Sequence, residues 1–361
     1  MLRPKIKISL SGRGAAHIHG VLWLDLKAIK VEGANNFVLQ DAYRKLRKSE
    51  GLESYERAAL EKFTDAFVTC TRCVTVAGEE AVRIAEEVNW HSHSNSCKKG
   101  GRRTCRWKFP RFPLARTIFV DANREDEGGR MDAKEREDIL NRVMGVLVEE
   151  SGGQKVLSKT VESIMLSGRY PNVRKIDEGK GQQEGTSSFD ARENSHFDAR
   201  ENSNIGTGDN PSFDARKNSN IDTGGSSNFN AEENSKTEAE KKSKAEKVKR
   251  KQNAGSYVKM ESPEEYKVNI RRRIEEVLAI ASAGRTLITY EKYEQAVMEQ
   301  PRKGSEVLLQ RDIDEIMVNN YNAEWIVSWN ANIDLSPVYD YFGTITYVTD
   351  YFTKVSSIIF L

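Results

Sequence analysis

The sequence has few cysteines, no large excess of either charge and no long apolar run, and each of these absences excludes a class of protein. Four cysteines among 361 residues are too few for the disulfide framework of a small secreted domain. No segment approaches the roughly 20 apolar residues that span a bilayer, and the N-terminus lacks the apolar region of a secretion signal. Lys and Arg number 56 and Asp and Glu 54, which gives a formal net charge of +2. We therefore expect neither a membrane protein nor a secreted one, and the total charge by itself does not indicate a nucleic-acid partner.

The middle of the chain, residues 177–255, is poor in the residues that build a core. Its 79 residues include seven from the set Val, Ile, Leu, Met, Phe, Trp and Tyr. The heptapeptide Phe-Asp-Ala-Arg-Glu-Asn-Ser starts at Phe189 and at Phe197, and altered copies start at Phe213 and Phe229. Copies this short bury too little apolar surface to offset the entropy that is lost on ordering. The sequence therefore predicts a disordered, repeat-containing insert.

The two remaining parts, residues 1–176 and 256–361, show the periodicities of folded structure. Residues 5–11 alternate between polar and apolar side chains, as in a half-buried strand, and a second strand is expected over 17–26. Helical patterns cover residues 55–68, 78–88, 132–148, 263–282, 290–298 and 339–354. Helices combined with antiparallel-looking strands predict an α+β fold.

A His-Ile-His sequence at residues 17–19 is a candidate metal site. Residues two apart in a strand point to the same face of a sheet, so His17 and His19 would lie side by side. Two imidazoles whose Cα atoms are about 6–7 Å apart can bind one divalent metal ion. The alternative interpretation is a pair of unrelated surface histidines.

Two tyrosines near the end of the chain, Tyr347 and Tyr351, are followed by Lys354. On a helix, residues four apart share a face, so both phenols would project into one site. A tyrosine hydroxyl can act as a covalent nucleophile. The alternative is an aromatic pair that packs in a core or at its rim.

Cysteine and histidine residues gather in the first part of the chain at the short spacings that suit tetrahedral zinc. We expect a structural rather than a catalytic ion, because the candidates are numerous enough to leave no position for water. The alternative is free thiols in a reducing compartment. The predicted zinc ligands are Cys97, Cys105 and His93 together with either His91 or Cys70.

The same region, residues 97–116, carries eight Lys and Arg side chains and no acid. Aromatic side chains are interleaved with the cations. Cations that contact phosphates, together with aromatic rings on which bases stack, form the usual surface for single-stranded nucleic acid. A solvated basic loop is the alternative. The predicted DNA-binding residues are Lys98, Lys99, Arg102, Arg103, Arg106, Trp107, Lys108 and Arg111.

Taken together, five segments resemble the N-terminal nuclease region of Helitron rolling-circle transposases, which are HUH endonucleases. Residues 12–24 are similar to the strand that gives HUH enzymes their name, and residues 91–113 to the Cys/His-rich basic segment of the family. Residues 320–322, 329–334 and 347–354 are similar to the run that leads to the nucleophile helix. The segments occur in the order of the family pattern.

This resemblance implies an HUH-type antiparallel sheet and a metal-dependent reaction on single-stranded DNA in the nucleus. His17 and His19 would hold Mg²⁺ or Mn²⁺, which polarises the scissile phosphate. Tyr347 or Tyr351 would attack the phosphorus and leave a 5′-phosphotyrosine and a free 3′-hydroxyl, and Lys354 would contact the phosphate. The second tyrosine would allow strand joining in rolling-circle replication of a transposable element.

Three features depart from the family pattern. The chain starts almost at the HUH strand, it lacks the Gly-x4-Gly-Lys-Ser/Thr loop of the helicase domain, and it has Ser9 and Ser11 where an acidic residue is common. We therefore expect a truncated transposase fragment with a weakened metal site. The alternative is a non-catalytic, zinc-stabilised module that binds single-stranded DNA.

Overall fold

The computed structural model describes one of the two units into which the chain divides. The first unit comprises Met1–Ile176 and Lys244–Leu361, and the second is Asp177–Ser243. The described residues are 3–10, 16–23, 30–93, 97, 105–121, 129–152, 154–176, 257–302, 304–339 and 346. The predicted insert lies outside them, so its disorder stays a prediction.

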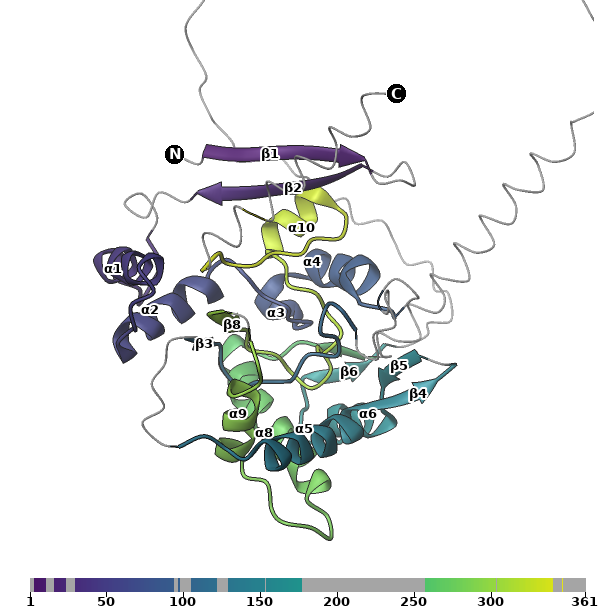
Figure 1. Cartoon of the computed structure of the whole chain (residues 1–361). Helices are drawn as coiled ribbons and strands as arrows, with labels where there is room; N and C mark the ends of the chain where they lie inside the picture. Colours follow the sequence, from purple (N-terminus) through teal and green to yellow (C-terminus); the bar gives the residue numbers. More distant parts are fainter. Residues whose placement is uncertain are drawn as a thin grey trace, which may run out of the picture. The chain divides into compact units, whose positions relative to one another are not determined.

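The first unit has the mixed helix and strand content of an α+β fold (Figure 1). The α-helices are α1 (Asn36–Arg47), α2 (Ser54–Asp65), α3 (Val74–Ala77), α4 (Glu79–Ile84), α5 (Ala133–Leu147), α6 (Lys159–Met165), α8 (Pro263–Ala281), α9 (Tyr290–Met298) and α10 (Ala323–Trp329). A π-helix, η1 (Ala85–Asn89), continues α4. The strands are β1 (Arg3–Leu10), β2 (Ala16–Trp23), β3 (Ile118–Val120), β4 (Val148–Ser151), β5 (Gln154–Leu157), β6 (Val173–Lys175), β7 (Tyr257–Lys259) and β8 (Glu306–Leu308).

The strands pair antiparallel in twos: β1 with β2, β3 with β8, β4 with β5, and β6 with β7. Two of these pairs, β3–β8 and β6–β7, join strands from opposite sides of the predicted insert. Among the described residues no sheet has more than two strands. The α+β class is therefore observed, and a wider sheet of the HUH type stays a prediction.

The sequence predicts helix bounds best where the first turn of the helix has its own capping residues. At α8, the Ser262 side chain accepts from the Glu265 backbone while the Glu265 carboxylate accepts from the Ser262 backbone, and Pro263 takes the first helical position. The predictions for 132–148 and 290–298 are confirmed by α5 and α9, and those for 55–68 and 78–88 by α2 and by α4 with η1. The strands expected near residues 5–11 and 17–26 are confirmed by β1 and β2.

The helix expected from residue 339 does not begin there. Tyr339 lies in irregular structure, where its hydroxyl is 2.8 Å from the Thr64 hydroxyl in a small core between α1 and α2. The remainder of that predicted helix, apart from Thr346, lies outside the described residues.

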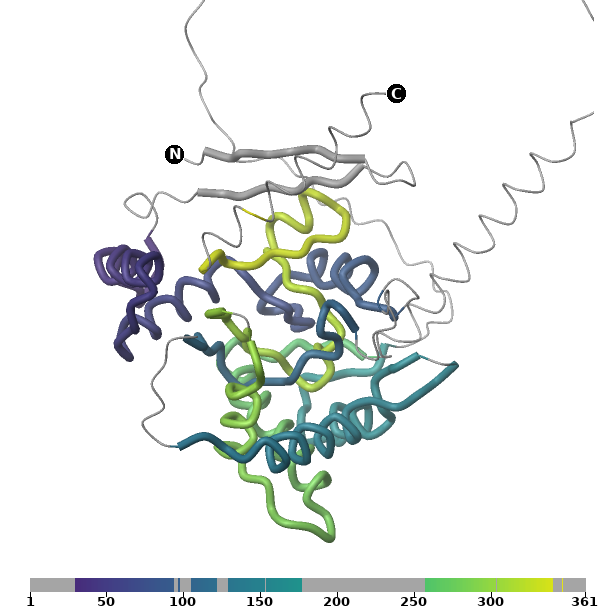
Figure 2. Tube along the Cα trace, in the orientation of Figure 1, coloured from purple at the N-terminus to yellow at the C-terminus, as the bar shows by residue number. Residues whose placement is uncertain are grey.

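Residues 309–321, called the central segment below, run through the core without forming a helix or a strand. The trace of this segment is drawn in yellow-green in Figure 2. The segment exchanges backbone hydrogen bonds with three distant parts of the chain. Tyr321 pairs with Thr69 at 2.8 Å, and Arg311 pairs with Leu114 at 2.9 Å. Nearly all of its side chains are buried. A buried loop needs partners for its polar backbone, and these bridges supply them while fixing the position of the segments that carry the site.

Candidate metal centre and nucleic-acid interface

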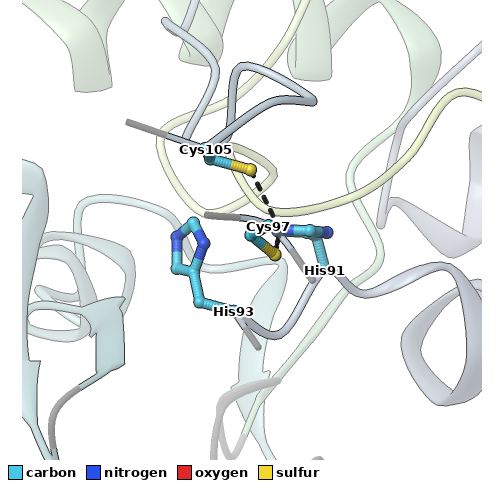
Figure 3. Close-up of side chains that lie close together, drawn as sticks. All are labelled: His91, His93, Cys97 and Cys105. Atoms are coloured by element: carbon cyan, nitrogen blue, oxygen red, sulfur yellow. Dashed lines mark hydrogen bonds between the residues drawn. The ribbon is translucent and has the colours of Figure 1, made fainter. Parts of the chain in front are cut away.

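Two histidines and two cysteines converge beside the central segment. His91, His93, Cys97 and Cys105 each place one ligand atom within 4.8 Å of all the others (Figure 3). His91 Nε2 lies 3.5 Å from Cys97 Sγ and 3.4 Å from Cys105 Sγ. Cys97 is fully buried and the other three are half-buried. The cluster is therefore compact and is closed on the side of the core.

The protein holds this cluster in place through its backbone and through an aromatic ring. The His91 N–H, which follows η1 and Trp90, donates to the Met317 carbonyl of the central segment at 2.7 Å. The Arg106 N–H donates to the Cys97 carbonyl at 3.1 Å. The His91 ring stacks on Phe109 with centroids 4.3 Å apart and an interplanar angle of 13°. The four side chains thus converge because separate segments are fixed to one support.

The geometry of the cluster suits a tetrahedral zinc ion. Sulfur and nitrogen ligands about 2.3 and 2.1 Å from such an ion lie about 3.6 Å from each other, close to the two Sγ–Nε2 separations. Burial, helped by His93 and Arg111, lowers the pKa of His91 to about 4. The imidazole is therefore neutral at pH 7, which is the form that binds a metal. Two thiolates and two imidazoles form a closed set of the kind found in structural sites.

Cys70, the other predicted candidate for the fourth ligand, does not join the cluster. Its thiol donates to the Gln310 carbonyl at 3.2 Å, and burial raises its pKa to about 12. Cys73 is also buried, and its sulfur lies 3.3 Å from the Glu261 carbonyl. Of the two alternatives left open by the sequence, His91 is the one that the structure brings to the other three.

The basic residues near the cluster divide into an exposed pair and partnered side chains. The Arg106 guanidinium lies over the Trp107 ring, 3.9 Å from its centroid, and both side chains are exposed. Lys108 forms an ion pair with Glu306 at 3.2 Å. Arg111 is half-buried and donates to Asn320. Lys98, Lys99, Arg102 and Arg103 lie outside the described residues.

The residues predicted for HUH chemistry are described only in part. His17 and His19 belong to β2, and the hairpin register pairs them with Ser9 and Lys7 of β1 respectively. Ser11, Tyr347, Tyr351 and Lys354 lie outside the described residues.

The family-like sequence at 320–322 has structural roles. Asn320 accepts hydrogen bonds from Arg111 at 2.6 Å and from Arg311 at 3.0 Å, and Tyr321 is buried and donates to the Thr71 carbonyl at 2.6 Å. The Asn322 side chain caps α10 by accepting from the Trp325 N–H at 3.0 Å.

A second cluster of possible metal ligands, which the sequence did not indicate, already holds a cation from the chain itself. Asp312, Asp314 and Glu315 are completely buried. Lys259 Nζ, at the end of β7, donates to all three carboxylates at 3.2, 2.8 and 2.6 Å. Arg72 and Arg273 add further ion pairs to Asp314 and Asp312 at 2.7 Å. The ammonium therefore takes the position that a metal ion would need, and this buried ionic network is structural.

Comparisons with protein-family models, with curated proteins and with solved structures gave no match to this chain. No helix in the described part of the chain is both long and apolar enough to cross a bilayer.

Proposed function

We propose that this protein is a zinc-stabilised module that binds single-stranded nucleic acid. The observation that carries the proposal is the convergence of His91, His93, Cys97 and Cys105 directly beside the exposed Arg106–Trp107 pair. Zinc would join the segment around His91 to the segment that starts at Cys105, and both are fixed to the central segment. The ion would thus hold the basic and aromatic side chains in one surface.

The chemistry of that surface favours a single strand. The base pairs of a duplex shield their faces, whereas an unpaired base can stack on an exposed ring such as Trp107. Trp107 is 37% exposed and contacts the zinc cluster through His91, whose ring centroid is 5.6 Å away. Arg106, stacked on the same ring, supplies a charge for the neighbouring phosphate.

Replacing Trp107 with Ala should weaken binding of an oligothymidylate by about 5- to 150-fold, because stacking of one base contributes about 1–3 kcal/mol. The measurement is fluorescence anisotropy with a labelled oligonucleotide at fixed ionic strength. The matched control is Trp329→Ala, since Trp329 is similarly exposed, at 46%, and lies on α10 outside the site. Equal losses in the two variants would contradict the proposal. So would a wild-type affinity that does not fall with salt, because each phosphate neutralised on a single strand contributes about 0.7 to the log–log slope.

We also infer, as a second candidate, a nuclease of the Helitron HUH type that acts in the nucleus. The observation that favours it is the antiparallel β1–β2 hairpin, which places His17-Ile-His19 within a strand. Paired histidines on one strand, with Mg²⁺ or Mn²⁺, and the tyrosines Tyr347 and Tyr351 are the parts that such a reaction uses. The hairpin register pairs Ser9 with His17, and an HUH-type sheet would place a third ligand near that position.

Changing Ser9 to Glu should tighten Mn²⁺ binding and increase nicking of a labelled single-stranded oligonucleotide, because a carboxylate offsets the lost hydration of a hard cation better than a hydroxyl does. Cleavage should leave the protein attached to the 5′ end and should disappear in a Tyr347→Phe/Tyr351→Phe variant. The control is Ser9→Glu in a His17→Ala background, where no gain is expected. Cleavage that persists without both tyrosines would rule out this mechanism.

A further inference from the structure

A pocket of about 490 Å³ opens between the segment after Cys105, the end of α9, β8 and the central segment. Its volume falls within the roughly 300–1,000 Å³ of small-ligand sites. The lining residues include Arg111, Arg311, Asn320, Trp107 and Phe112. Lys108 and Arg302 also line it, together with Glu306, to which both are ion-paired. The pocket therefore adjoins the surface proposed above for nucleic acid and combines positive charge with aromatic surface.

The guanidinium groups of Arg111 and Arg311 share a neutral partner. Arg111 and Arg311 both donate to Asn320 Oδ1, at 2.6 and 3.0 Å. Their other hydrogen bonds go to the Asn319 amide oxygen and to the Glu315 and Val318 carbonyl groups. Within the part of the chain that the structure describes, neither arginine forms an ion pair with a carboxylate. Burial and the neighbouring Arg311 lower the pKa of Arg111 to about 10, against the smaller raising effects of Asp334 and Glu306, so it still carries its charge at pH 7.

A buried guanidinium, that of Arg311, beside the half-buried one of Arg111, neither of them ion-paired to an acid among the described residues, is costly for the protein unless an anion completes the site. Buried charges are normally paired, and the penalty for leaving one unpaired amounts to several kcal/mol. The planar guanidinium of arginine matches the geometry of a phosphate group and can donate two parallel hydrogen bonds to it. Asn320 adds a possible third donor, because its amide nitrogen donates no hydrogen bond to the described residues. This arrangement contrasts with the buried ionic network around Lys259, where acids surround every cation.

We propose that this pocket binds one nucleotide of a single-stranded nucleic acid, with its phosphate on Arg111, Arg311 and Asn320 and its base beside Trp107 and Phe112. The inference rests on the proposed nucleic-acid-binding function and specifies where on the protein a strand is held. The same phosphate-ester chemistry could come from a free nucleotide, which the experiment distinguishes from a strand.

The sharpest test is Asn320→Asp in the full-length protein. The new carboxylate is nearly isosteric with the amide, accepts the same two hydrogen bonds, and places inside the wall the negative charge that the phosphate would supply. The variant should therefore melt at a higher temperature than the wild type and should bind an oligothymidylate at least tenfold more weakly. The charge-matched control is Asn330→Asp, because Asn330 is exposed at the end of α10 and does not line the pocket. Its affinity should stay within about twofold of the wild type.

Binding of three ligands is compared to identify the ligand class of the pocket. They are a labelled oligothymidylate, thymidine 5′-monophosphate and inorganic phosphate. The expected result is that the monophosphate raises the melting temperature of the wild type, competes with the oligonucleotide, and does neither in Asn320→Asp. A shift by inorganic phosphate equal to that by the nucleotide would overturn the assignment of a nucleotide. Wild-type affinity in Asn320→Asp would overturn the pocket proposal while leaving the proposed function in place. If the wild type binds the monophosphate but no oligonucleotide, the proposed function fails and the site belongs to free nucleotides.

Discussion

Replacing Lys259 with Met is expected to destabilise the fold by about 3–5 kcal/mol, which is the usual cost of removing one partner from a buried ion pair. The side chain is 1% exposed, and its ammonium is the common donor to Asp312, Asp314 and Glu315. Met fills a similar volume but leaves three carboxylates in the core with less compensating charge. Urea unfolding followed by circular dichroism measures the loss. The control is Lys292→Met, because Lys292 pairs with Glu135 at the surface, where an ion pair contributes about 0–1 kcal/mol.

The pH dependence of this loss separates a charge effect from a packing effect. Burial opposes the ionisation of Asp314, but Lys259 and Arg72 outweigh it and lower its pKa from 3.8 to about 2. In the wild type this group therefore contributes stability that is complete above the unfolded-state pKa and is lost as the pH falls toward the folded-state pKa. Without Lys259, Asp314 keeps its ion pair with Arg72 but loses the charge that lowers its pKa most, so its pKa should rise and protonation should relieve the excess negative charge. The difference between variant and wild type should therefore be largest at neutral pH and should shrink as the solution is acidified.

A second substitution, Asp314→Asn, tests whether the loss of stability in Lys259→Met comes from charge. In Lys259→Met/Asp314→Asn, one of the carboxylates that bound the missing ammonium, at 2.8 Å, is replaced by a neutral amide, so part of the lost stability should return. A destabilisation by Lys259→Met that is the same at all pH values, and that Asp314→Asn does not reduce, would show that the network contributes through shape rather than charge.

Purified protein is expected to contain one zinc ion per chain, and Cys105→Ser should reduce that content to near zero after dialysis. A serine hydroxyl remains protonated at neutral pH and cannot replace a thiolate ligand. Because binding of a structural zinc ion is coupled to folding, with apparent free energies of about 10–16 kcal/mol in small zinc domains, the melting temperature should also fall. Elemental analysis measures the zinc content, and thermal unfolding with and without a chelator measures the melting temperature.

The matched control is Cys70→Ser. Cys70 is a buried cysteine that donates to a backbone carbonyl and lies outside the cluster, so the variant should lose some stability but keep its zinc. Loss of zinc in both variants would point to general unfolding rather than to a missing ligand. A wild-type protein that neither contains zinc nor takes it up on titration would reject the metal centre.

Local sequence signals were sufficient to predict the helices that begin with a cap and bury a regular face. The capping box at Ser262 and the periodic burial of α8 lie within a single stretch of chain, as do the Asp132 cap and the buried face of α5. The sequence did not predict α1, α3, α6 or α10. The first buries only Leu39 and Ala42, and the other three have four to seven residues each. An apolar periodicity cannot be recognised from so few buried positions.

The cluster of His91, His93, Cys97 and Cys105 was predicted in part from the sequence. The spacing of His91, His93, Cys97 and Cys105 within 15 residues of sequence was enough to nominate the ligands, because short spacings bring side chains together whatever the rest of the fold does. The choice between His91 and Cys70 was not available from the sequence, since it depends on which segment the central segment holds beside the cysteines.

The sequence by itself determined the α+β class, the capped helices and the identity of most candidate zinc ligands, because these follow from interactions between residues that are close along the chain. Only the tertiary structure decided that the charged central segment is buried and that Lys259, Arg72 and Arg273 together pair with its three carboxylates. It also decided that Arg111 and Arg311 meet at Asn320, with no ion pair to an acid among the described residues. A run such as Arg311-Asp-Ile-Asp-Glu315 resembles a solvated loop when read alone. Its burial is stable because cations from distant parts of the chain, including a lysine more than 50 residues away, are brought to it by the packing of the whole unit.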